Sequence, residues 1–112
     1  MKVHYAWPGI SLLERIKSWF PCRHRYYAMK WMKLKDTVTN VKFMRGTNGM
    51  PVCMVVIFCH TSWYSTLPSI MHIHSSSVRN AWKDFLDMIA EHENMRNADE
   101  LCIWLDMKEG LA

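Results

Sequence analysis

Residues 37–60, TVTNVKFMRGTNGMPVCMVVIFCH, decide the fold of this chain. Apolar and polar side chains alternate over residues 37–45, which is typical of a strand with one buried face. Residues 51–60 are rich in Val, Ile, Phe and Met on both faces, which indicates a central strand covered on both sides. The GTNG segment at residues 46–49 supplies the positive-φ residues that a tight hairpin requires. The stretch therefore predicts an antiparallel hairpin at the centre of a sheet.

Upstream of this hairpin the sequence predicts a short strand and two helices. Residues 2–7 alternate loosely and end at a Pro-Gly turn, as an edge strand does. Ser11 and Glu14 form a capping box that begins a helix, and Pro21 ends that helix. Residues 22–35 keep apolar side chains at helical spacing, which favours a second helix over a strand. The predicted buried stripe of this second helix is Tyr27, Trp31 and Leu34.

Downstream of the hairpin the sequence predicts one more strand and two more helices. Residues 69–74 have the composition of a third strand, and the serines at 75–77 offer an N-cap for the helix that follows. That helix, over residues 78–95, has the broadest apolar stripe in the chain, so it and the central strand are predicted to form the heart of the core. Asn97 and Glu100 repeat the capping pattern and begin a last short helix.

The order of these elements predicts one α+β domain over residues 1–112. We expect a small antiparallel sheet of three or four strands, with N-terminal and C-terminal helices packed on it. The longest mostly apolar run, residues 51–59, is too short for a transmembrane helix of about 20 residues. The first 20 residues lack the uninterrupted apolar core of a secretory signal. We therefore expect a cytoplasmic protein with no transmembrane span, whose four cysteines are reduced and mostly buried.

Charge is divided unevenly along the chain. Residues 1–45 hold ten Lys and Arg against two acidic residues, a net charge of +8, whereas residues 46–112 hold four against eight, a net charge of −4. Aromatic side chains alternate with the cations from residue 15 to residue 45, a mixture that can follow a phosphate backbone while stacking bases. A solvated basic helix face is the alternative interpretation. The predicted contacts with nucleic acid or an acidic partner are Arg23, Arg25, Lys30, Lys33, Lys35, Lys42 and Arg45.

Large apolar side chains are unusually frequent for a chain of this length. Six Trp and ten Met are more than one small core normally uses. Trp63 and Tyr64 fall in a predicted loop, and Trp, Tyr and Met are enriched at the centres of protein interfaces. We therefore predict that Trp63 and Tyr64 contact a protein partner.

No motif of the sequence carries a specific catalytic or metal-binding mechanism. His72 and His74 should point to one face of their strand, beside the strand that carries Cys59 and His60. No pair of the Cys and His residues has the spacing of a structural zinc module. We accordingly assign no metal ligand, no cofactor and no catalytic residue.

Three functions remain as hypotheses. The element order resembles, in topology alone, that of the small ribosome-dependent ribonuclease toxins of bacteria, and the strand histidines could act as general acid and base on RNA. A direct nucleic-acid-binding module is a second possibility. The expected function is instead non-enzymatic: a small regulator or inhibitor, of the type that phages and mobile elements encode, that docks on a protein partner such as a nucleic-acid-processing enzyme.

Overall fold

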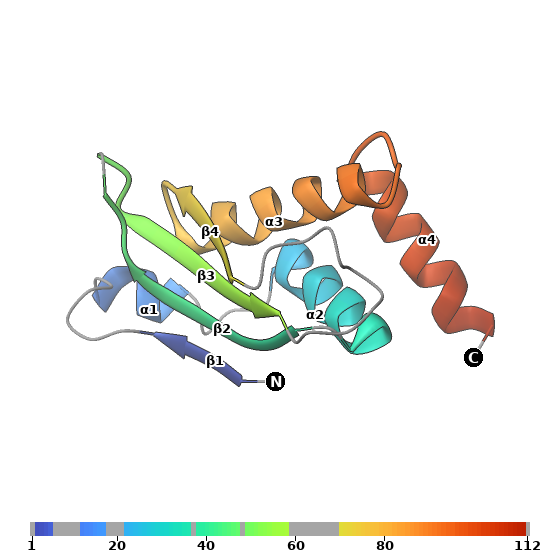
Figure 1. Cartoon of the computed structure of the whole chain (residues 1–112), viewed down its shortest axis with the longest axis horizontal. Helices are drawn as coiled ribbons and strands as arrows, with labels where there is room; N and C mark the ends of the chain where they lie inside the picture. Colours follow the sequence, from blue (N-terminus) through green and yellow to red (C-terminus); the bar gives the residue numbers. More distant parts are fainter. Residues whose placement is uncertain are drawn as a thin grey trace.

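The computed structural model describes residues 2–5, 12–17, 22–36, 38–47, 49–58 and 70–111. Within these ranges the chain forms a four-stranded sheet and four helices (Figure 1). The elements are β1 (Lys2–Tyr5), α1 (Leu12–Lys17), α2 (Arg23–Lys35), β2 (Val38–Arg45), β3 (Val52–Phe58), β4 (Ile70–Ser75), α3 (Val78–His92) and α4 (Ala98–Leu111). Their order is the one that the sequence predicts, and the α+β class is confirmed.

The sheet is mixed, whereas the sequence predicted an antiparallel one. Its strand order is β1-β2-β3-β4, in which β2, β3 and β4 pair antiparallel and β1 pairs parallel to β2. The physical reason is the connection between Tyr5 and Val38, which contains α1 and α2. Parallel neighbours require a long crossover of this kind, whereas an antiparallel pair can be joined by a short turn.

The turn between β2 and β3 explains why a glycine stands at position 46. The backbone N–H of Gly46 donates a hydrogen bond to the carbonyl oxygen of Pro51 at 3.1 Å, and Met50 N–H donates to Thr47 at 3.2 Å. A Cβ atom at Gly46 would collide with the Met50 carbonyl oxygen. Gly49 adopts φ 83°, a backbone conformation that residues other than glycine rarely adopt. The predicted tight hairpin is therefore present.

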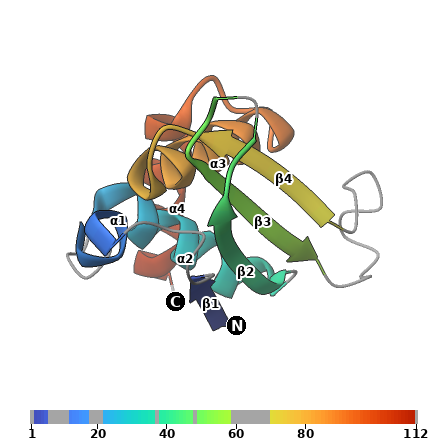
Figure 2. The ribbon, with the colours of Figure 1, turned by 90° about the vertical axis from the view of Figure 1, so that its left-hand side faces the viewer.

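The core lies between the inner face of the sheet and the helical layer, in which α2 and α3 pack against each other. Phe43 of β2 stacks on Tyr5 of β1, with ring centroids 5.2 Å apart, and meets Trp82 of α3 edge-on at 5.4 Å. Phe85, also on α3, meets Trp31 of α2 edge-on at 5.9 Å. Figure 2 shows the helices gathered on one side of the sheet. Helix α3 and the central strand β3 thus form the heart of the core, as predicted.

Helix α2 is rotated relative to the prediction. Its buried residues are Ala28, Trp31 and Met32. Leu34, which the sequence analysis placed in the buried stripe, keeps 48% of its surface exposed, so that part of the prediction is wrong. The reason is that Trp31 must face Phe85 of α3, and this contact turns Leu34 toward solvent.

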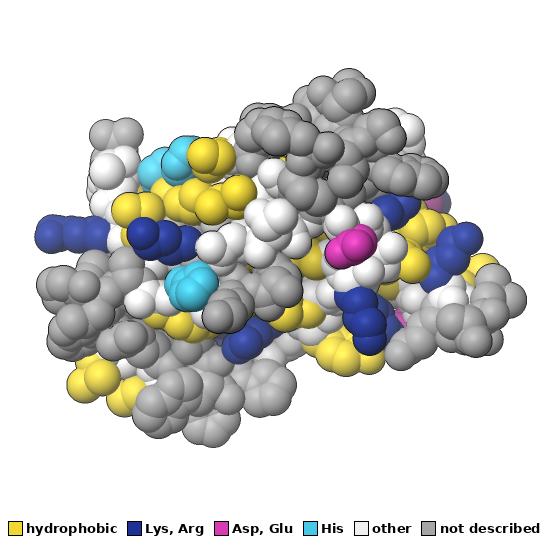
Figure 3. Space-filling model, turned by 60° about the horizontal axis from the view of Figure 1, so that its bottom comes forward, with side chains coloured by type: hydrophobic (Ala, Val, Ile, Leu, Met, Phe, Trp, Pro, Cys, Tyr) yellow, Lys and Arg dark blue, Asp and Glu magenta, His cyan; other side chains and the backbone are white. Residues whose placement is uncertain are grey.

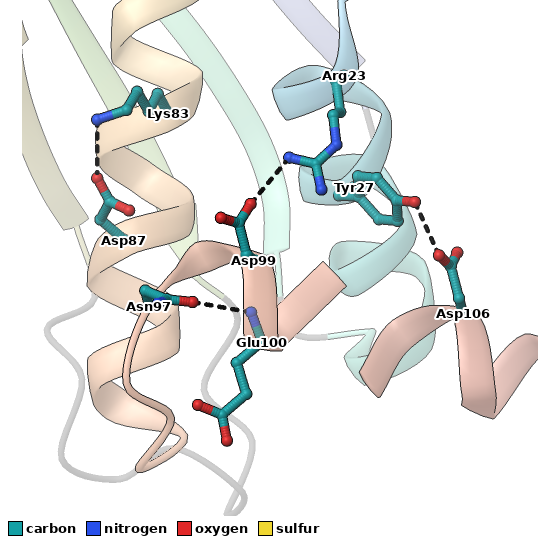
Figure 4. A network of polar contacts seen from close by, with 8 residues as sticks. All are labelled: Arg23, Tyr27, Lys83, Asp87, Asn97, Asp99, Glu100 and Asp106. Carbon is teal, nitrogen blue, oxygen red and sulfur yellow. Dashed lines mark hydrogen bonds and ion pairs between the residues drawn. The ribbon is translucent and has the colours of Figure 1, made fainter. Parts of the chain in front are cut away.

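The predicted helix caps downstream of the sheet are confirmed. Ser77 Oγ accepts a hydrogen bond from the Asn80 backbone N–H at 3.1 Å, which begins α3. Asn97 Oδ1 accepts one from the Glu100 N–H at 2.9 Å, which begins α4 (Figure 4). The capping box predicted at Ser11 lies outside the described residues. None of the helices in the described ranges is both long and apolar enough to cross a membrane.

The described cysteines agree with the expectation of reduced thiols. Cys22, Cys53 and Cys102 are free, and the last two are buried. Burial is the main cause that raises the pKa of the Cys53 and Cys102 thiols. Cys59 lies outside the described residues.

Two isoleucines provide a matched test of this core. Ile89 of α3 is fully buried, whereas Ile103 of α4 keeps 61% of its surface exposed. We expect Ile89→Ala to lower the free energy of unfolding by about 2–5 kcal/mol because it leaves a cavity. Ile103→Ala should change it by no more than about 0.5 kcal/mol. Urea unfolding followed by circular dichroism measures both values, and equal losses would show that the core is wrongly assigned.

Candidate interaction surfaces

The strand register places a row of polar side chains across the outer face of the sheet. We use this name for the face opposite the one that packs on α3. His4 lies opposite Lys42, Lys42 opposite Val55, and Val55 opposite His72, so that the row crosses all four strands. Because side chains alternate between the two faces of a strand, these four residues point to the same side.

The neighbouring rows of the outer face mix apolar and polar positions. One row contains Met44 and Cys53 and ends at His74. The other crosses the positions of Lys2, Asn40 and Ile57 and ends at Ile70. In the middle of the face, on β3, Cys53 and Val55 are buried, whereas Ile70 at the edge keeps 50% of its surface exposed.

The outer face therefore combines exposed apolar side chains with cationic and ionisable ones. His4, Lys42, His72 and His74 are exposed. Figure 3 looks onto this side of the molecule and shows His and Lys or Arg side chains beside a hydrophobic area on the left, over the strands. None of the outer-face positions that the structure describes carries a carboxylate. The electrostatic character of this face favours an anionic partner.

The seven predicted basic contact residues do not form one surface. Lys42 lies on the outer face, and Arg45 is exposed at the end of β2. The other five lie on α2, on the helical side of the sheet: Arg23, Arg25, Lys30, Lys33 and Lys35.

Within the described part of the chain, Arg23, Lys30 and Lys35 of α2 lie within ion-pair distance of acidic residues of the last third of the chain, which for the first two are residues of α4. Arg23 Nη1 lies 3.2 Å from Asp99 Oδ1, and Lys30 Nζ lies 3.0 Å from Asp106 Oδ1. The hydroxyl of Tyr27 donates a hydrogen bond to the other carboxylate oxygen of Asp106 at 2.8 Å. Figure 4 shows Arg23 and Tyr27 reaching across to the two aspartates of α4. The uneven charge of the sequence is thus partly matched inside the fold.

The third pair is formed at the C-terminal end of α2. Lys35 Nζ lies 3.6 Å from Glu93 Oε1, and the indole Nε1 of Trp31 donates a hydrogen bond to the same oxygen at 3.2 Å. Lys35 also lies over the ring of Trp104, 5.3 Å from its centroid. The two remaining cations of α2, Arg25 and Lys33, are half-buried and exposed respectively.

The contacts of Asp106 shift its own pKa and the pKa of Tyr27. The hydrogen bond from Lys30, and after it the one from Tyr27, lowers the pKa of the Asp106 carboxyl below its ordinary value of 3.8. The same contact with Asp106 raises the pKa of the Tyr27 hydroxyl. Both shifts follow from hydrogen bonds that stabilise the ionised carboxylate and the protonated phenol.

Part of the predicted chemistry lies outside the described residues. This holds for Trp63 and Tyr64, and for Cys59 and His60. Among the residues with a described position, no group of three or more His, Cys, Asp and Glu is arranged to hold a metal ion. The sequence analysis missed His4, Met44 and Ile70 as outer-face residues. The period-two alternation on each strand was the available signal, but it does not say which strands are neighbours.

Comparisons with protein-family models, with curated proteins and with solved structures gave no match. The function is therefore argued from the surfaces of this chain.

The ion pairs of Asp106 predict a specific pH dependence of stability. Because the pKa of Asp106 is lowered in the folded state, its carboxylate stabilises the fold at pH values above the ordinary carboxyl pKa. This contribution to stability is lost as the pH falls through the lowered pKa. We expect Asp106→Asn to have a lower Tm than the unchanged protein at pH 7. The two Tm values should converge between about pH 5 and pH 2. A Tm difference that stays constant over this range, measured by thermal unfolding, would contradict the assignment.

Proposed function

We propose that this protein is a non-enzymatic binding module that docks on an acidic surface of a protein partner through the outer face of its sheet. The observation that carries the proposal is the composition of this face. Exposed Met44 and Ile70 lie beside exposed Lys42, His72 and His74, and the described positions of the face hold no carboxylate.

The balance of apolar and charged groups favours a protein over a nucleic acid as the partner on this face. Protein interfaces have an apolar centre and a polar rim, whereas protein–DNA interfaces are more polar and far more positively charged. The exposed apolar side chains of the outer face are Met44 and Ile70, and the positively charged residues at its described positions are Lys2 and Lys42. A cationic rim around an apolar centre fits an acidic protein surface.

The predicted interface residues Trp63 and Tyr64 extend this proposal. In the sequence they lie between β3 and β4, the two strands that carry the apolar centre of the outer face. We propose that both side chains take part in docking, together with Lys42 of the outer face. Aromatic side chains of this size supply much of the binding energy in protein complexes.

We further propose that the module acts in the cytoplasm as a regulator or inhibitor of a nucleic-acid-processing enzyme. Cationic groups on two sides of the molecule, the outer face and α2, would attract it to an assembly that holds nucleic acid. We also propose that the module is encoded by a phage or mobile element.

One observation favours a second candidate, a small ribonuclease of the toxin type. His72 and His74 are both exposed on the outer face, two residues apart on β4, so their Cα atoms are about 7 Å apart. Two imidazoles at such spacing could act on one phosphodiester as general base and general acid. Cleavage of an RNA oligonucleotide that is lost in both His72→Ala and His74→Ala would establish this activity in place of docking.

Two matched pairs of variants test the docking surface. The partner is first captured from the source cells in the presence of nuclease, identified and purified. Lys42→Glu on the outer face is compared with Lys83→Glu on α3, whose side chain is 53% exposed. Ile70→Glu is compared with Ile103→Glu on α4. We expect each outer-face variant to weaken the complex at least about tenfold. Substitution of a residue at the centre of an interface typically costs more than about 1 kcal/mol of binding free energy.

The two control variants should bind as the unchanged protein does, and Trp63→Ala should weaken the complex. Equal affinities for outer-face and control variants in a calorimetric titration would refute docking through the sheet. A complex that disappears on nuclease treatment would show that nucleic acid, and not a protein surface, holds the two together.

A further inference from the structure

Helix α2 carries a cluster of two cations and two aromatic rings on consecutive turns, which we call the α2 cluster: Arg23, Tyr26, Tyr27 and Lys30. The guanidinium carbon of Arg23 lies 5.3 Å from the centroid of the Tyr27 ring. Lys30 Nζ lies 4.7 Å from the Tyr26 centroid and 5.3 Å from that of Tyr27. The spacing i, i+3, i+4 and i+7 brings the four side chains together on one side of the helix.

The cluster already binds anions, namely the carboxylates of α4. Asp106 accepts hydrogen bonds from Tyr27 through one oxygen and from Lys30 through the other, at 2.8 and 3.0 Å. Asp99 accepts one from Arg23 at 3.2 Å (Figure 4). Arg, Lys and Tyr side chains donate hydrogen bonds to phosphate oxygens in the same way. The two carboxylates therefore occupy the positions at which phosphate oxygens would be bound.

We propose that the α2 cluster binds the phosphodiester backbone of single-stranded nucleic acid, and that Asp99 and Asp106 of α4 are built-in competitors for this site. The inference is independent of the docking surface, because the cluster lies on the helical side of the sheet and the outer face lies opposite.

Replacement of the carboxylates by phosphate does not require α4 to leave the fold. The side chains of Asp99 and Asp106 are 76% and 51% exposed, and ion pairs of exposed groups contribute little to stability. Helix α4 is held instead by Leu101, Cys102 and Leu105, which are buried. Rotation of the two aspartate side chains is enough to free the cations.

The exposed ring of Tyr26 indicates a single strand and not a duplex. Tyr26 keeps 54% of its surface exposed, and its ring meets Tyr27 edge-on at a centroid distance of 5.1 Å. An exposed aromatic ring beside a phosphate-binding cation can stack an unpaired base. The bases of a duplex are stacked on one another and are not available to it.

A double variant with a charge-matched control tests the proposal. The test variant is Asp99→Asn with Asp106→Asn. The control is Asp84→Asn with Asp87→Asn on α3, which changes the formal charge by the same two units. The probe is a fluorescently labelled 20-nucleotide oligouridylate, titrated at several salt concentrations with anisotropy as the readout.

We expect the test variant to bind oligouridylate at least tenfold more tightly than the unchanged protein and to show a steeper salt dependence. The control variant should gain clearly less, because its carboxylates do not touch the α2 cluster. Lys30→Gln added to the test variant should remove the gain and lower the salt slope by about one. Tyr26→Ala in the same background should weaken binding to oligouridylate but not to an abasic strand of equal length.

Two results would overturn the proposal: an equal gain in test and control variants, or no gain in the test variant. Unchanged oligouridylate binding on Tyr26→Ala would overturn the assignment to a single strand. Should the double variant unfold, Asp99→Asn alone serves as the test, because the Asp99 side chain is 76% exposed and pairs with Arg23 of the α2 cluster. Absence of a gain in that variant also counts against the proposal.

Discussion

The burial of two aromatic side chains of α3 is the interaction on which the rest of the structure depends. Trp82 contacts Phe43 of the sheet, and Phe85, one turn later, contacts Trp31 of α2. These two contacts decide which face of the sheet is covered and how α2 is rotated about its axis. The first contact places α3 on the inner face, opposite the exposed side chains of His72 and Lys42. The direction of the α2 cations toward α4 is the consequence of the second.

The orientation of α2 determines how much of the uneven charge of the chain faces outward. Read along the sequence, a basic first part and an acidic last part suggest two separate external faces. In the fold, part of that charge is paired internally, because Arg23 and Lys30 meet Asp99 and Asp106. The acidic helix next to a basic one lowers the repulsion among the α2 cations. It also means that counting charges overestimates how strongly this part of the molecule attracts a phosphate backbone.

Local patterns were enough to predict the elements but not how they meet. The alternation over residues 37–45 and the Asn97 cap are local features, and both were predicted correctly. The parallel pairing of β1 depends on a crossover through two helices, which no local pattern records. The position of His4 beside Lys42 follows from that pairing, so the place of His4 in the polar row could not be foreseen. Leu34 was misplaced for a similar reason, since the contact between Trp31 and Phe85 joins residues far apart in the sequence.

The period of a strand explains why stability and binding are separable in this fold. The core uses every second residue of β4, Met71 and Ile73, and leaves the residues between them to the outer face. The outer-face positions of β4 are thus free of packing constraints, and their side chains can be fitted to a partner. On β3 this freedom is smaller, because Cys53 and Val55 are buried although they lie on the outer face. Specificity for a partner should therefore reside in the flanking strands, because the outer-face side chains Cys53 and Val55 of β3 are buried.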